Sequence, residues 1–418
     1  MINRTEAPEL NKLDHIDFVT PKNIPLENGA ILHWINEVSD DAVKIDFIFQ
    51  AGTIFDKKLV AKLTGDLLFS GTPNKTSSEI NESIDRLGGF TNVEVTAEDV
   101  TVSVLGLKEN IDELVSIVLD AIKNAHFDEK ELKQKIQSKR QGMAISLQKV
   151  ATQARRAFVK SLFGNTPYGA MTELEDFDAI DRNEIINFHR NFYKNGLQKI
   201  AVVGNLDQRQ IDQLILQVKG MTCKERKLDK YDFQYKAENI HLEKEDAVQT
   251  AIRVGRILFN KTHKDYIDFY ILNTVLGGYF GSRLMSSIRE DKGYTYGIGS
   301  GIAQMKQTGY FFISTEVGKD VKDDAIQAIR EEIELLQNES INESELSLVR
   351  NYSIGQLLKN SDGPFAMMDR YLSVHKFGME LDYYDEVIKH LQNITPLKIQ
   401  DLANKYLKWD ELVVVSAG

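Results

Sequence analysis

The sequence has little cysteine and no long apolar run. Among its 418 residues the one cysteine is Cys223, which excludes a disulfide framework and a metal cluster built from cysteines. No stretch stays apolar for the ~18 residues that a membrane-spanning helix needs, so we expect no membrane span. The opening residues, MINRTEAPELNKLDH, show no charged start followed by an apolar run. We therefore expect no secretory leader and a cytoplasmic protein by default, or a periplasmic one if a leader has been removed.

Basic residues are also fewer than acidic ones. The chain holds 51 Lys and Arg against 62 Asp and Glu, for a net charge of −11. Binding to nucleic-acid phosphates requires a basic surface, so nucleic acid is not an expected partner. The length exceeds that of one ordinary hydrophobic core, which predicts two domains.

Two halves of the sequence follow the same order of predicted elements. Apolar strands are predicted at 43–52 and 199–206 in the first half, and at 250–259 and 412–418 in the second. Helical patterns and alternating strands lie between them in both halves. In the first half, the capping box of Thr76 with Glu79 predicts the start of a helix, and alternation predicts a half-buried strand at 100–107. The closing strands stand about 210 residues apart, a period that indicates domain duplication and not a solenoid.

The repeated order predicts an α+β fold of two homologous domains. Each domain is expected to hold a largely antiparallel sheet with helices on one face. The predicted domains are 1–222 and 240–418, joined by a polar linker at 223–239.

The residues alone supply no complete active site. None of the eight histidines stands three or four residues from another, so no helix face carries a histidine pair for a metal. The nucleophile elbow of α/β-hydrolases and the glycine-rich nucleotide-binding loops are also missing. Without a comparison to other proteins, the sequence indicates a two-domain α+β protein with no self-contained active site.

Several short segments, taken in order, resemble the pitrilysin/insulinase peptidases. The segments are FSGTPNKTSSEINESIDRLGG, FGNTPYG, VVGNL, GMELDYYDEVI and ITPLKIQDLANKYL. Arg289 precedes Tyr296 by seven residues, which is the spacing of the family's second-half signature. The resemblance covers nearly the whole chain and points to the half-sized bacterial form related to mitochondrial processing peptidase. It implies a half-clamshell fold.

The resemblance also locates the family's zinc site, and the residues there do not suit it. The family binds zinc through H-x-x-E-H on a helix and a glutamate farther on. The matching segment is KLTGD, with Lys62, Gly65 and Asp66 at the positions of the two ligands and the base. A lysine ammonium has no lone pair for a metal, and glycine cannot act as a base.

The distal ligand is missing as well. No Asp or Glu occurs from Leu132 to Thr172. We therefore expect no metal and no other cofactor on this chain. An ion pair between Lys62 and Asp66, four residues apart, is the predicted replacement.

By the resemblance, related bacterial enzymes pair two half-sized chains. One chain holds the zinc, and the other supplies the Arg/Tyr pair, as this chain is expected to do. Tyr296 is then expected to donate a hydrogen bond to the oxyanion that forms on the substrate carbonyl. Arg289 is expected to hold the substrate.

The resemblance further implies that a peptide binds as an added β-strand. The segment 90–99 resembles the family's edge strand and keeps its Asn92. Gly297 and Gly299 are expected to let an extended peptide approach closely.

Two functions remain open from the sequence. The first is a non-catalytic subunit of a heterodimeric zinc peptidase that degrades peptides, with zinc on a homologous partner. The second is a pseudopeptidase that binds peptides or scaffolds an assembly without proteolysis. A homodimer in isolation is also open.

Structural interpretations compete with the functional ones. Arg289 in a last helical turn is also typical of a cap, and Tyr296 is also typical of strand packing. The window Leu132–Lys160, with eight Lys and Arg and no acid, is interpreted as a solvated helix face. A docking surface for an acidic partner is the alternative interpretation of that window.

Overall fold

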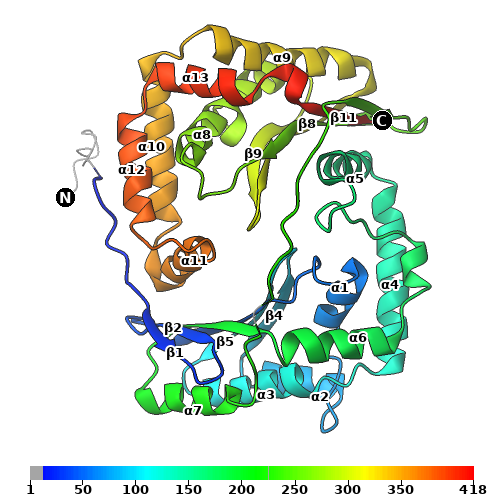
Figure 1. Cartoon of the computed structure of the whole chain (residues 1–418), viewed down its shortest axis with the longest axis vertical. Helices are drawn as coiled ribbons and strands as arrows, with labels where there is room; N and C mark the ends of the chain where they lie inside the picture. Colours follow the sequence, from blue (N-terminus) through cyan, green and yellow to red (C-terminus); the bar gives the residue numbers. More distant parts are fainter. Residues whose placement is uncertain (1–12, 225) are drawn as a thin grey trace, which may run out of the picture.

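The strands of the chain form two separate sheets, one in each half (Figure 1). The structure is a computed structural model that describes residues 13–224 and 226–418. The first sheet has the order β1-β2-β6-β3-β5-β4 and the second has the order β7-β11-β8-β10-β9. The strands of the first sheet are β1 (Lys22–Pro25), β2 (Ile31–Ile35), β3 (Ala42–Phe49), β4 (Phe90–Val95), β5 (Val100–Leu107) and β6 (Leu197–Val203). Those of the second are β7 (Asn239–Leu242), β8 (Gln249–Leu258), β9 (Ile298–Gln304), β10 (Gly309–Gly318) and β11 (Val413–Ala417).

The two sheets share one topology. With β1 set aside, β7, β8, β9, β10 and β11 take the places of β2, β3, β4, β5 and β6. The β2–β6 and β7–β11 pairs are parallel, and the other pairs are antiparallel. The predicted duplication and the predicted largely antiparallel sheets are confirmed.

Helices fill the connections in both halves. The first half holds α1 (Lys58–Asp66), α2 (Ser77–Arg86), α3 (Ile111–Asn124), α4 (Glu129–Leu147), α5 (Val150–Phe163), α6 (Arg182–Phe188) and α7 (Gln208–Val218). The second holds α8 (Tyr266–Asn273), α9 (Lys322–Asn338), α10 (Glu343–Lys359), α11 (Gly363–His375), α12 (Tyr383–Asn393) and α13 (Pro396–Tyr406). Shorter helical segments are η1 (Glu175–Phe177), η2 (His189–Tyr193), η3 (Thr274–Gly278), η4 (Met285–Asp291), η5 (Lys319–Val321) and η6 (Trp409–Glu411). The capping box predicted for α2 is present, with Thr76 and Glu79 each accepting from the other's backbone N–H.

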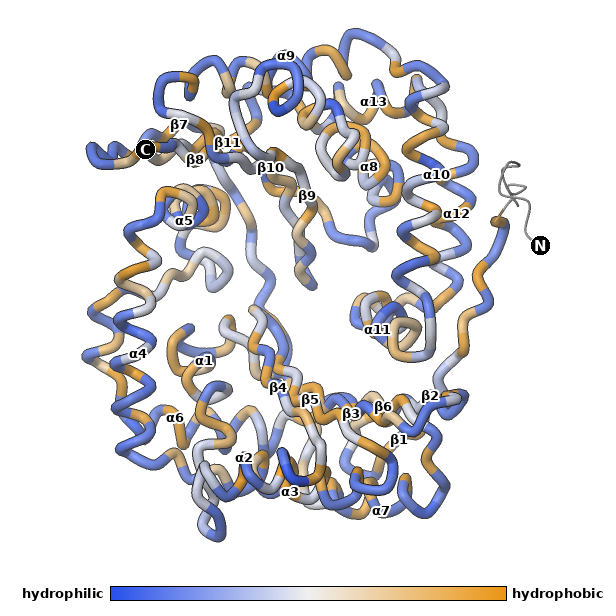
Figure 2. Tube along the Cα trace, turned by 180° about the vertical axis from the view of Figure 1, so that it is seen from behind, coloured by the Kyte–Doolittle hydropathy of each residue, from blue (hydrophilic) through white to orange (hydrophobic). Residues whose placement is uncertain are grey.

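Each sheet has an apolar face and a more polar one. Along β3, Ile45 and Phe47 belong to the core beneath α1 and α3, whereas Lys44 and Asp46 line the opposite face. The period of two in the sequence sets this division. Figure 2 shows hydrophobic residues gathered along β3, β5 and β6.

Each half contributes one helix that packs on the sheet of the other half. Helix α5 of the first half packs on β8 and β11 of the second sheet, where Phe158 shares one buried cluster with Ala251 and Val413. Helix α11 of the second half packs on β6 of the first sheet, where Tyr371 and Met368 join Val203. These packings cover part of the second face of each sheet, opposite its main core, with a helix from the other half (Figure 1).

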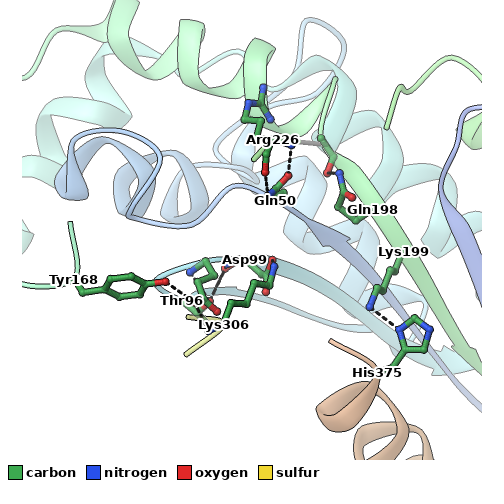
Figure 3. Close-up of polar contacts among 11 residues, drawn as sticks. Gln50, Thr96, Asp99, Tyr168, Gln198, Lys199, Arg226, Lys306 and His375 are labelled. Atoms are coloured by element: carbon green, nitrogen blue, oxygen red, sulfur yellow. Dashed lines mark hydrogen bonds and ion pairs between the residues drawn. The ribbon is translucent and has the colours of Figure 1, made fainter. Parts of the chain in front are cut away.

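The segment between the two sheets runs without helix or strand from residue 226 to residue 238. Its start is held to the first sheet, because the Gln50 side chain donates to the Arg226 carbonyl (2.6 Å) and accepts from the Arg226 N–H (2.7 Å). Figure 3 shows this pair. The domain limits 1–222 and 240–418 stay a prediction. Within the described residues, none of the helices is both long and apolar enough to span a bilayer.

Loss of the α5 packing is expected to destabilise the fold. Phe158 is 1% exposed among side chains of both halves, so Phe158→Ala should lower the free energy of unfolding by about 3–5 kcal/mol. The control Phe90→Ala alters an exposed ring and should change it by about 0.5 kcal/mol or less. Urea denaturation measures both. Equal effects of the two variants would contradict a structural role for α5 in joining the halves.

Acid is expected to weaken the α11 packing, because His33 of β2 lies against Tyr371 of that helix, with ring centres 5.2 Å apart. Burial, followed by nearby His375 and Lys199, lowers the pKa of His33 to about 3. At pH 7 the imidazole is neutral in both the folded and the unfolded chain, but as pH falls from about 6.5 towards 3 the unfolded chain binds a proton that the folded chain does not, so the free energy of unfolding decreases progressively. His33→Asn should flatten the pH dependence of the urea midpoint over this range. An unchanged dependence would show that His33 does not titrate with unfolding.

Candidate functional site

Helix α1 carries the three positions where the family's zinc motif falls. A Cβ added to Gly65 would lie 2.5 Å from Cγ2 of Val95 on β4, so a longer side chain does not fit there without movement. Asp66 forms its ion pair with Lys139 of α4 at 2.6 Å. The predicted Lys62–Asp66 ion pair is therefore wrong, because a lysine from the neighbouring helix reaches the carboxylate instead.

This donor set does not suit a zinc ion. Zinc in proteins takes nitrogen, sulfur and oxygen ligands, usually at least three from the protein. The three positions offer one carboxylate, and that carboxylate is paired with Lys139. Across residues 13–224 and 226–418, no group of three or more His, Cys, Asp or Glu side chains is placed to hold a metal.

A cavity of about 520 Å³ lies between α1, α4, α5 and the segment 171–177. We call this space the basic cavity. Its charged lining residues are Lys58, Lys62, Lys135, Lys139, Arg155, Arg156 and the single acid Asp66. Burial and the nearby Lys62 lower the pKa of Lys58 to about 8, and burial and Lys139 also lower the pKa of Lys62.

The basic cavity changes the interpretation of the window Leu132–Lys160. Lys133 and Arg140 are exposed, as a solvated helix face requires. Lys135, Lys139 and Arg155 line the basic cavity, and of these Lys139 and Arg155 are also exposed. The solvated-face interpretation therefore fits most of the basic side chains of the window, whereas their gathering with Lys58 and Lys62 of α1 around one cavity is a tertiary feature that the sequence pattern does not show.

Arg289 lies on η4 in the second half. Its guanidinium sits 4.7 Å from the centre of the Phe280 ring and 3.7 Å from the Glu290 carboxylate. The prediction placed Arg289 at a helix end, and η4 ends two residues later at Asp291. A π-helical turn at this point is typical of functional sites.

Tyr296 lies outside the core. Its side chain is 95% exposed, so it makes no packing contribution. Strand β9 begins at Ile298, two residues after Tyr296. Residues 294–297 are held by hydrogen bonds other than the sheet ladder.

Thr295, which the sequence did not single out, fixes the backbone beside Tyr296. Its hydroxyl accepts from the Gly297 N–H (3.1 Å) and from the Thr315 hydroxyl (2.9 Å), and it lies 2.7 Å from the Glu316 carbonyl oxygen. The Tyr294 N–H donates to the Ile288 carbonyl of η4 at 3.0 Å. These bonds tie the tyrosine's segment to both β10 and η4 while the tyrosine itself stays free of the core.

The three glycines after Tyr296 have different surroundings. A Cβ on Gly297 would meet nothing within 4 Å, and one on Gly299 would lie 3.4 Å from the Gly277 carbonyl oxygen. A Cβ on Gly301 would lie 2.9 Å from the Phe312 ring. Internal packing thus accounts for Gly301, whereas it does not require glycine at 297.

Asn92 lies on β4, the edge strand of the first sheet. Val93 and Val95 pack on the core beside α1, while Asn92 and Glu94 are exposed on the other face. Strand β4 holds the same place in its sheet as β9 holds in the second. The segment predicted as an edge strand is therefore an edge strand, and it is the topological counterpart of the strand after Tyr296.

A second cavity, of about 700 Å³, lies between the two halves. Lys306, from the β9–β10 turn, donates its N–H to Glu98 (2.6 Å) and its ammonium to Asp99 (3.0 Å). The Tyr168 hydroxyl from the FGNTPYG segment also donates to Glu98, at 2.7 Å. Figure 3 shows these contacts and the Lys199–His375 contact across the same space.

The structure does not gather all the predicted residues at one place. Lys62 and Asp66 line the basic cavity in the first half. Arg289 and Tyr296 belong to the second half and are not among the residues that line the cavity between the halves. A complete active site is therefore not assembled from the described residues of this chain.

Two family models match the sequence. Residues 33–172 match the model described as Insulinase (Peptidase family M16), and residues 179–352 match Peptidase M16 inactive domain. The chain belongs to the M16 family. The resemblance drawn from the short segments is thereby confirmed, and the sequence contains no H-x-x-E-H segment.

Known M16 proteins resemble the chain over most of its length. An uncharacterized zinc protease of Rickettsia felis is 25% identical over 77% of this chain and 79% of its own length. A non-peptidase homolog, YmxG, of Helicobacter pylori is 23% identical over 86% of this chain and 85% of its own. The crystal structure of a peptidase M16 inactive domain from Pseudomonas fluorescens superimposes with a TM-score of 0.87, at 23% identity over 96% of this chain and 98% of that one. The last comparison confirms the two-domain α+β fold.

The purified chain is expected to hold no stoichiometric zinc. Lys62 cannot ligate zinc and Gly65 cannot activate a water molecule, and the Asp66 carboxylate is paired with Lys139. Elemental analysis after dialysis measures the zinc content. About one zinc per chain, removable only by a strong chelator, would contradict this assignment.

Proposed function

We propose that the chain is the non-catalytic, Arg/Tyr-supplying subunit of a heterodimeric zinc metallopeptidase that degrades peptides. The zinc belongs to a homologous half-sized partner with an intact H-x-x-E-H motif. The observation that carries the proposal is the exposure of Tyr296, a fully solvated aromatic side chain on a tightly anchored backbone. Tyrosine and arginine are enriched among the residues that carry most of the binding energy at interfaces.

The chemistry of the two side chains supports this role. A tyrosine hydroxyl is a good donor for an oxyanion, and such donors act best when they are positioned before the reaction begins. Thr295 supplies that positioning for Tyr296. Arg289, held by the Phe280 ring, offers a planar charged donor for a substrate carbonyl or carboxylate.

The edge strands support peptide binding. Strands β4 and β9 each have a neighbour on one side only, and an extended peptide binds to such an edge through backbone hydrogen bonds. Open space at Gly297 leaves room for a chain to approach the segment beside Tyr296. The peptide thus binds close to the tyrosine that acts on its carbonyl.

Tyr296→Phe should separate catalysis from folding. Removal of one oxyanion donor is expected to lower turnover by the reconstituted pair by about 10²–10³-fold. The melting temperature should not change, because the ring is solvated. Arg289→Ala should lower both substrate affinity and rate. Peptide hydrolysis by the zinc-bearing partner, mixed with each variant, measures the effects.

Matched controls make this experiment decisive. Tyr270→Phe alters another exposed tyrosine of the same half, on α8, and should leave turnover unchanged. The isolated chain should hydrolyse nothing above background. Full activity of Tyr296→Phe in the pair would overturn the catalytic role. Peptide binding without any hydrolysis by the pair would instead favour the scaffold function.

A further inference from the structure

The basic cavity concentrates positive charge on an acidic protein. Six of its lining side chains are Lys or Arg and one is acidic, although the whole chain has a net charge of −11. Like charges so close repel one another and raise the free energy of the folded state unless an anion joins them. The lowered pKa of Lys58 reflects this crowding together with burial.

The charges of the basic cavity are poorly matched within the chain. Lys139 is paired with Asp66, and Arg156 is paired with Glu173 at 2.6 Å. Lys62, Lys135 and Arg155 form no hydrogen bond or ion pair with any described residue. Three side chains from α1, α4 and α5 therefore present unmatched charges to one space.

The cavity has an apolar wall as well. Its apolar lining residues are Leu59, Met143, Leu147, Val159, Met171 and Phe177, and the rest of the lining is Ser138, Gly142, Ser146, Thr152 and Thr172. A volume of about 520 Å³ falls within the usual range of small-molecule sites, about 300–1,000 Å³. The space is larger than a single phosphate or sulfate requires, and part of it suits an organic group.

We propose that the basic cavity binds a compact anion that carries two or more phosphate groups. The excess of five positive charges among the lining residues matches a ligand with several negative charges in a small volume. A terminal phosphate group supplies about two charges and three acceptor oxygens, and each phosphate linked to it adds a further charge. Lysine is a common phosphate ligand, and arginine donates to phosphate in pairs of hydrogen bonds.

A phosphorylated ligand fits better than an acidic peptide. An extended peptide offers about one carboxylate for each 3.3–3.6 Å of chain, whereas the unmatched Lys62, Lys135 and Arg155 line a single cavity. The ligand's source is an inorganic polyphosphate or a nucleotide, since both bring linked phosphates. The proposal concerns α1, α4 and α5, and it does not depend on the proposed pairing or on Arg289 and Tyr296.

Calorimetric titration of the full-length chain tests the proposal. The probes are inorganic triphosphate, ATP, sodium sulfate and a glutamate-rich decapeptide, all at one ionic strength. The variants are Lys62→Gln and Arg155→Gln. The control is Lys133→Gln, which removes one charge from helix α4, where Lys133 pairs with Glu129 and does not line the basic cavity.

We expect triphosphate to bind, and each cavity variant to bind it about tenfold or more weakly, since one charge-assisted contact is lost. Lys133→Gln should bind as the unmodified chain does. Tighter binding of ATP than of triphosphate identifies a nucleotide as the ligand, and the reverse identifies inorganic polyphosphate. Thermal melts of each variant exclude misfolding, and triphosphate should raise the melting temperature of the unmodified chain.

Several outcomes would overturn the proposal. One is the absence of triphosphate and ATP binding. Another is equal weakening by Lys133→Gln, or equal binding of sulfate, because long-range charge alone would then explain the result. Tighter binding of the glutamate-rich peptide than of triphosphate would replace the proposal with an acidic-peptide site.

Discussion

Helices α5 and α11 are the elements on which the arrangement of the two halves depends. Each packs on the sheet of the other half, and each buries aromatic side chains there, Phe158 on the second sheet and Tyr371 on the first. Apolar burial of this kind is the dominant favourable term in folding. Polar contacts such as Lys306 with Asp99 lie between these two packings, and partly exposed ion pairs add little free energy by comparison. The packed helices therefore hold the halves together, and the polar contacts set their register.

Because the two halves share one topology, the fold has two equivalent edge strands. Strands β4 and β9 occupy equivalent places in sheets of the same topology. The first keeps valines that pack on α1, and a Cβ at Gly65 would collide with Val95. The second follows a glycine with open space around it. The two equivalent strands therefore differ, since β4 is fitted closely to its own helix and β9 follows a segment with room beside it.

Much of the fold could be predicted because the relevant signals are local. Alternation marked β5, the Thr76–Glu79 capping box marked the start of α2, and the repeat of elements marked the duplication. The exchange of α5 and α11 could not be predicted, because no local pattern states which sheet a helix packs on. The partner of Asp66 was missed for the same reason, since Lys139 lies on another helix.

The candidate site, like the fold, could be predicted only in part. The family resemblance indicated that Arg289 and Tyr296 belong together. The residues next to Tyr296 in the sequence do not indicate that its side chain is exposed to solvent. Thr295 gave no signal at all, because its partners Thr315 and Glu316 lie on the next strand. Side chains that position a functional group act through tertiary contacts, so sequence patterns seldom identify them.

Loss of a metal does not by itself explain the charges around α1. A site that gives up a divalent cation loses two positive charges, and a lysine placed among the former acidic ligands could restore neutrality. Here the acids are missing as well, since Asp66 is the one carboxylate among the lining residues of the basic cavity. The six basic side chains therefore exceed what neutralisation requires, and they come from three separate helices. Stability alone would favour fewer of them, because unmatched like charges destabilise a folded state. Their presence in one cavity is better explained by an anion that binds there than by the disappearance of zinc.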